Sequence, residues 1–130
     1  MSIPFFGLVA VVIYENFFKR KIFSARDWRA VWIFGVAASL VLYPSALGLT
    51  HIDTCSWGWS CNGLVAAVAV ITIFLLWKKN AFGVLLLLAL GAFAFQLQAS
   101  ANLWDYVIDP IYGVIAFGMM AKEGMLLRKH

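Results

Sequence analysis

The chain has 130 residues, of which 64% are hydrophobic and 12% are charged, with a formal net charge of +4. Apolar residues make up about 45–50% of a typical soluble domain, and a soluble fold of this length could not bury so large an excess. The composition therefore excludes a soluble enzyme and a disordered chain, and it predicts one all-α integral membrane domain over residues 1–130.

Five apolar runs predict the helices of this domain. About 20 residues cross a bilayer as a helix, and backbone polar groups in hydrocarbon must be paired within the chain. The runs lack the two-residue alternation of barrel strands, so we expect a small bundle of five transmembrane helices with short loops. If the first run lay flat on the surface, four would cross. The expected spans are residues 3–18, 30–49, 63–77, 81–97 and 107–121.

The ten Lys and Arg residues fall in three groups, and each group flanks an apolar run. The groups lie within residues 19–29, 78–79 and 122–129. This distribution is typical of topology signals, because cationic segments stay on the cytoplasmic side. It argues against nucleic-acid binding.

The charges also predict an orientation. With the N-terminus outside and the C-terminus in the cytoplasm, every Lys and Arg lies inside, and residues 50–62 and 98–106 form outer loops. The first basic group follows the first apolar run, which is the reverse of a secretory signal peptide. We expect a multi-pass protein of the bacterial inner membrane.

Aromatic residues are placed as this orientation requires. Trp and Tyr favour the membrane–water interface, so we expect most of them to be interfacial anchors. The expected inner anchors are Tyr14, Trp28, Trp32 and Trp77, and the expected outer anchors are Tyr43, Trp57, Trp59, Trp104 and Tyr106.

Two cysteines, Cys55 and Cys61, lie in the first outer loop with five residues between them. Disulfides persist in the oxidising periplasm, so we expect a disulfide that holds this loop. A redox-active pair and a metal site that includes His51 and Asp53 remain alternatives.

Polar residues near the outer side form a candidate rim. Carboxylates suit a divalent cation, which could bridge to a lipid head group. The alternative is that the rim only solvates loops and caps helices, since Asp109 before Pro110 is typical of a helix start. The members of this rim are His51, Asp53, Gln96, Gln98, Asp105 and Asp109.

Glu15 is the carboxylate that lies inside an apolar run. Ionisable residues in membrane spans are functional candidates. Lys19 follows four residues later, which is the favourable order for an ion pair on a helix. We expect this pair to lie at the inner interface.

The chain has no phosphate-binding loop, no zinc-protease motif and no nucleophile elbow. We therefore expect a small non-catalytic accessory subunit that binds another membrane protein, with no cofactor. One alternative is a membrane enzyme or lipid-handling protein that uses the outer acidic rim. A second alternative is a membrane immunity or exclusion protein.

Overall fold

The computed structural model describes residues 2–49, 51, 62–98 and 102–129. Within these ranges the chain forms six helices and no strand, so the all-α prediction is confirmed for the described residues. The helices are α1 (Ile3–Phe18), α2 (Ala25–Ala46), α4 (Asn62–Trp77), α5 (Phe82–Ala94), α6 (Leu103–Val107) and α7 (Pro110–Arg128).

Helix α2 begins five residues before the expected run at 30–49, because a capping box defines its start. The Asp27 N–H donates to Ser24 Oγ at 3.3 Å, and the Ser24 N–H donates to Asp27 Oδ2 at 2.9 Å. This reciprocal pair satisfies amide groups that the first turn of a helix leaves unpaired. The helix therefore includes the polar residues that precede its apolar stretch.

The run expected at 107–121 is divided between two helices. Val107 ends α6, and Ile108 and Asp109 are extended before Pro110 opens α7. Proline disfavours the helical conformation in the residue before it, which explains the break. Helix α7 then continues to Arg128, seven residues beyond the expected end at residue 121.

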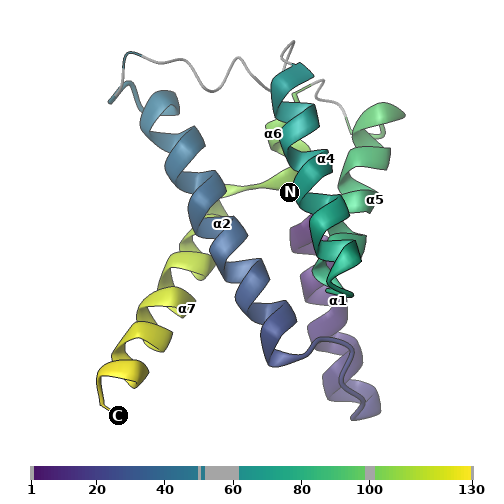
Figure 1. Cartoon of the computed structure of the whole chain (residues 1–130), viewed down its shortest axis with the longest axis vertical. Helices are drawn as coiled ribbons and strands as arrows, with labels where there is room; N and C mark the ends of the chain where they lie inside the picture. Colours follow the sequence, from purple (N-terminus) through teal and green to yellow (C-terminus); the bar gives the residue numbers. More distant parts are fainter. Residues whose placement is uncertain (1, 50, 52–61, 99–101, 130) are drawn as a thin grey trace.

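Helix α5 contacts four other helices. It forms a hairpin with α4 and also packs against α1, α2 and α6 (Figure 1). Its residues Phe82, Leu86 and Ala89 are fully buried. Most of α6 is buried against it, and the Tyr106 ring meets the Phe93 ring edge-on at 5.5 Å between centroids.

Helices α2 and α7 cross in close contact, as Figure 1 shows. Small residues allow the approach: a Cβ on Gly35 would lie 2.6 Å from the Ala116 Cβ, and a Cβ on Gly113 would lie 2.5 Å from Ser39 Oγ. Such residues let two helix backbones pack closely. The Tyr112 hydroxyl of α7 also donates a hydrogen bond to the Val31 carbonyl oxygen of α2, which holds the two helices together.

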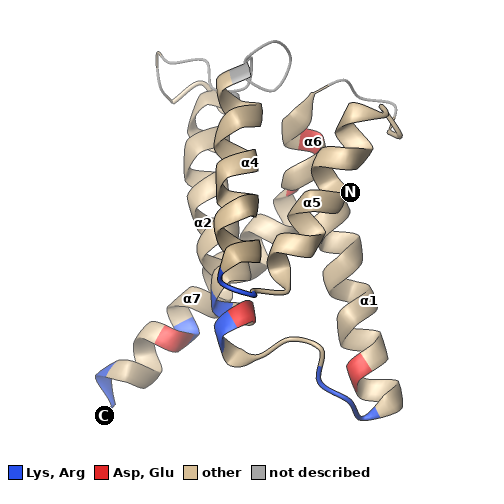
Figure 2. Cartoon of the chain, turned by 45° about the vertical axis from the view of Figure 1, so that its right-hand side comes forward, with Lys and Arg blue, Asp and Glu red and all other residues tan. Residues whose placement is uncertain are grey.

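All three basic groups lie at one end of the bundle, which we call the cationic end (Figure 2). Here α1 and α7 end, α2 begins and α4 turns into α5. Asp27, only 5% exposed, joins two of these segments, because its Oδ1 accepts from the Ala81 N–H at 3.3 Å. Arg26 Nη2 also donates to the Lys79 carbonyl oxygen at 3.5 Å.

One helix in the described ranges, at Ala25–Ser45, has both the length and the apolar composition needed to cross a membrane. The helices at Ile3–Phe18, Gly63–Trp77 and Phe82–Ala94 are apolar but shorter. The core helix of a soluble protein can meet the same two criteria, so length and composition describe this helix without placing it in a membrane.

Candidate functional site

The described residues of the expected outer rim differ in burial. His51, Gln96 and Asp105 are exposed, Gln98 is half-buried and Asp109 is buried. No three described His, Cys, Asp or Glu residues are placed to hold a metal ion. Asp53, Cys55 and Cys61 lie outside the described residues, so the disulfide stays a prediction.

The two glutamines belong to the turn that follows α5. Gln96 has a left-handed backbone (φ 50°). The Gln98 N–H donates to the Tyr106 hydroxyl oxygen at 3.1 Å, and that hydroxyl donates to the Gln98 carbonyl oxygen at 3.3 Å. Tyr106 is fully buried and Trp104 is 5% exposed, so both residues belong to the packed core.

Asp109 holds two helix starts that are far apart in the sequence. Its Oδ1 accepts from the Tyr112 N–H at 2.8 Å, which confirms it as the N-cap of α7. Its Oδ2 accepts from the Ser2 N–H at 3.0 Å and from the Ser2 hydroxyl at 2.8 Å. Ser2 is itself the N-cap of α1. This arrangement suits a carboxylate, because helix N-termini favour negative charge.

The Ser2–Asp109 contact is absent from the sequence prediction. A local signal did exist for one half of it, since Ser2 followed by Pro4 is typical of a helix start. No pattern along the chain connects residues 2 and 109. The Asp109 Oδ2 atom, which does not cap α7, therefore connects the start of α7 to the start of α1.

Glu15 contacts the backbone that follows α1. Its Oε1 accepts from the Ile22 N–H at 2.8 Å and from the Phe23 N–H at 2.9 Å. Lys19 is the C-cap of α1 with φ 57°, so it does not continue the helix as an i, i+4 pair requires. The ion pair that the described residues form is Arg29 with Glu123, at 3.9 Å. These hydrogen bonds of Glu15 thus hold the segment that follows α1 against the last turns of that helix.

These contacts predict different effects for two changes at Glu15. Glu15→Gln keeps an oxygen that can accept from both amides, so we expect a stability change within about 0.5 kcal/mol. Glu15→Ala removes the acceptor and should cost about 1 kcal/mol. Thermal unfolding in detergent compares the two variants. If an ion pair with Lys19 were the main interaction, Glu15→Gln and Lys19→Gln would each cost as much as Glu15→Ala.

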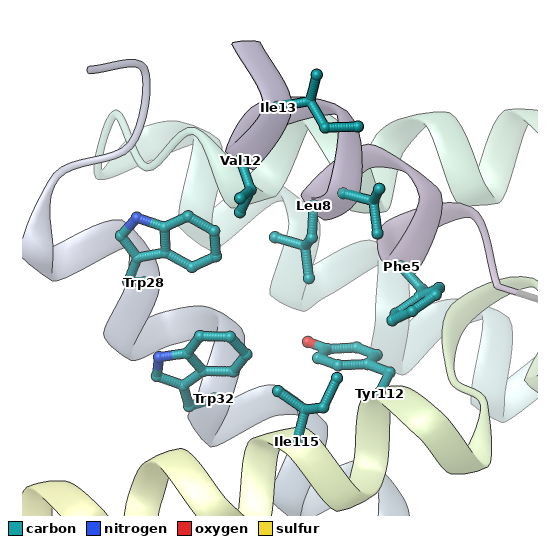
Figure 3. Close-up of a pocket in the computed structure, with 9 residues that line it drawn as sticks. Phe5, Leu8, Val12, Ile13, Trp28, Trp32, Tyr112 and Ile115 are labelled. Atoms are coloured by element: carbon teal, nitrogen blue, oxygen red, sulfur yellow. The ribbon is translucent and has the colours of Figure 1, made fainter. Parts of the chain in front are cut away.

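An apolar cleft of about 230 Å³ separates α1 from the α2–α7 pair. We call it the α1 cleft. Figure 3 shows Trp28 and Trp32 of α2 facing Val12 and Leu8 of α1 across the cavity. Its lining residues are Phe5, Leu8, Val9, Val12, Ile13, Trp28, Trp32, Tyr112 and Ile115.

Two features keep the wall of the α1 cleft on the α2–α7 side in place. The Trp28 and Trp32 rings are stacked, with centroids 5.4 Å apart. The Tyr112 hydroxyl donates to the Val31 carbonyl oxygen at 2.6 Å, so its polar group is satisfied while its ring lines the cavity. The opposite wall, α1, packs on α5 and α6. The cleft can therefore take an apolar group but offers it no catalytic side chain.

The sequence prediction missed the α1 cleft. Trp28 and Trp32 are four residues apart and so share one face of a helix, which was a usable signal. Their partners on α1 and α7 could not be predicted from local spacing. The sequence matches no known protein-family model, and comparisons with curated proteins and with solved structures gave no significant match.

Proposed function

We propose that the protein is a multi-pass membrane protein that serves as a small non-catalytic subunit of a larger membrane assembly. The observation that carries this proposal is the apolar surface of the helices. Phe17 of α1 is 79% exposed, Ile73 of α4 is 65% exposed and Val114 of α7 is 73% exposed. Apolar surface spread over several helices is costly in water, and lipid or protein would cover it.

The short helices are compatible with a membrane because of where they lie. Helix α5 has 13 residues and rises about 20 Å, less than the ~30 Å hydrocarbon core. It packs against α1, α2, α4 and α6, and its exposed residues Val84, Leu87 and Leu88 are apolar. The break at Ile108 and Asp109 is buried, and non-helical backbone is tolerated at membrane depth when protein encloses it.

The cationic end supports an orientation with this end in the cytoplasm. Aromatic side chains accompany the charges there: Lys78 Nζ lies 4.9 Å from the centroid of the Trp77 ring, and Trp77 is exposed. This combination is typical of a membrane–water interface. The C-terminal part of α7 would then lie in the cytoplasm, and the membrane would be a bacterial inner membrane.

The buried carboxylates favour a binding role over catalysis, because they accept hydrogen bonds from backbone amides that hold the fold together. Asp27 and Asp109 each accept hydrogen bonds from two segments of backbone. By contrast, α1 presents an uncovered apolar face. Phe6 and Phe17, both exposed, are eleven residues apart and so lie within about 20° of each other around the helix. We propose that an apolar helix of the partner protein packs on this face.

Native mass measurement after extraction in mild detergent tests the proposal. We expect a copurifying membrane protein, and we expect Phe6→Ala/Phe17→Ala to release it. Ile73→Ala/Phe74→Ala removes similar exposed side chains from α4 and serves as the control that retains the partner. A lone monomer from wild-type membranes would contradict the proposal.

A further inference from the structure

We propose that the α1 cleft binds one acyl chain of an anionic phospholipid, whose phosphate lies against the cations of residues 19–21. The proposal rests on the membrane integration proposed above. Phe6 and Phe17 do not line the α1 cleft, whereas Ile13, about 20° from Phe6 around α1, does line it, so the two surfaces adjoin along this helix.

The chemistry of the α1 cleft fits a hydrocarbon chain. Its lining side chains are aliphatic or aromatic, and the hydroxyl of Tyr112 is already bonded to Val31. The cavity lies between helices and is partly open at the side, so a chain could enter from the bilayer. Val9, Val12 and Ile115 are each more than 40% exposed at its margins, as a lateral opening requires.

Cations lie at one end of the same gap. The chain that joins α1 to α2 connects the two walls of the cleft, and it carries Lys19, Arg20 and Lys21, all exposed. Lys19 is six residues beyond the cleft residue Ile13, about 9 Å along a helix. A phosphate at this position would therefore be within the reach of a lipid whose chain occupies the cleft.

The nearest carboxylate does not neutralise these cations through an ion pair. Glu15 uses its Oε1 to accept from two backbone amides, and the ion pair of the described residues is Arg29–Glu123. Lys and Arg bind phosphate oxygens through charge-assisted hydrogen bonds. A zwitterionic head group also has a phosphate, but the cation of that head group competes with Lys and Arg for the negative charge of the phosphate. The net charge of the site therefore favours an anionic lipid.

Lipid retention by the delipidated full-length protein tests this site. The probes are dioleoyl phosphatidylglycerol and dioleoyl phosphatidylcholine, which share their acyl chains, and native mass spectrometry in detergent counts the bound lipid. Val12→Trp fills the cleft, and Val70→Trp is its control on an exposed face of α4. Arg20→Gln/Lys21→Gln removes the charge, and Arg128→Gln/Lys129→Gln is the control with equal charge loss.

We expect one tightly held phosphatidylglycerol. Val12→Trp should weaken the binding of both lipids, while Arg20→Gln/Lys21→Gln should lower phosphatidylglycerol binding roughly tenfold and leave phosphatidylcholine unchanged. Both control variants should match the wild type. Equal binding of the two lipids by the wild type, or retention of phosphatidylglycerol by Val12→Trp, would overturn the lipid site.

Membrane integration is measured first, from the carbonate-resistant membrane fraction, for every variant. A wild-type protein absent from that fraction would contradict the proposed function. A protein that is integrated but shows no preference for phosphatidylglycerol would contradict the lipid site alone. A protein or a second copy of this chain in the cleft would appear as added mass that Val12→Trp removes, and it would likewise overturn the lipid proposal.

Discussion

Asp109→Ala should destabilise the protein by at least about 3 kcal/mol, because it removes an acceptor that three donors share. The Tyr112 N–H would lose its cap, which typically contributes about 1 kcal/mol. The buried Ser2 N–H and hydroxyl would lose their partner, and each unsatisfied buried donor costs about 1–3 kcal/mol. Thermal unfolding in detergent measures the total, and hydrogen exchange should show faster exchange at the starts of α1 and α7.

Asp109→Asn separates the two roles of this side chain. Asn is as good an N-cap as Asp, so capping alone predicts almost no effect. Its single oxygen can serve either Tyr112 or Ser2, however, and we expect a loss of about 1–2 kcal/mol. Glu123→Gln is the control, since its ion pair with Arg29 is exposed and should contribute less than about 0.5 kcal/mol. An Asp109→Asn variant as stable as the wild type would show that the contact with Ser2 is unimportant.

Gly35→Ala should separate α2 from α7. The new methyl group would lie 2.6 Å from the Ala116 Cβ and 3.0 Å from Tyr112 Cε2. The Ala116 methyl group cannot rotate away, so the two helices must move apart, and overpacking of this kind costs about 1–3 kcal/mol. Alanine is the better helix former by up to about 1 kcal/mol. We therefore expect a net loss of about 1–2 kcal/mol in thermal unfolding.

Two further variants identify the cause of that loss. Gly35→Ala combined with Ala116→Gly removes the nearest clash and should recover part of the stability. Gly118→Ala on α7 has no neighbour within 4 Å and should leave stability unchanged or slightly increased. If Gly35→Ala behaved like Gly118→Ala, the close contact between α2 and α7 would be refuted.

The features that the sequence predicted well depend on neighbouring residues. The first apolar run, residues 3–18, coincides with α1, and Asp109 before Pro110 does begin a helix. Apolar runs and helix caps depend on residues that are close together in the chain, so they can be recognised in a single sequence. The division of the run at 107–121 was not predicted, although its signal was local, because a proline disfavours helix in the residue before it.

The features that the sequence did not predict depend on residues that are distant in the chain. Asp109 contacts Ser2 across 107 positions, and Tyr112 contacts Val31 across 81. Trp104 and Tyr106, expected as outer anchors, are buried because α6 folds back against α5. Composition predicts that an aromatic ring lies near an interface, but only packing determines whether that ring faces lipid or protein.

The proposed membrane orientation is tested most directly by labelling single cysteines in intact cells with a membrane-impermeant maleimide. In a background with Cys55 and Cys61 replaced by Ser, one exposed cysteine is placed at Leu97, at Ile22 or at Gly124. These changes leave every Lys and Arg in place. We expect Leu97→Cys to react in intact cells, and Ile22→Cys and Gly124→Cys to react only after the membrane is permeabilised. Labelling of Ile22→Cys in intact cells, or recovery of the protein in the soluble fraction, would contradict the account.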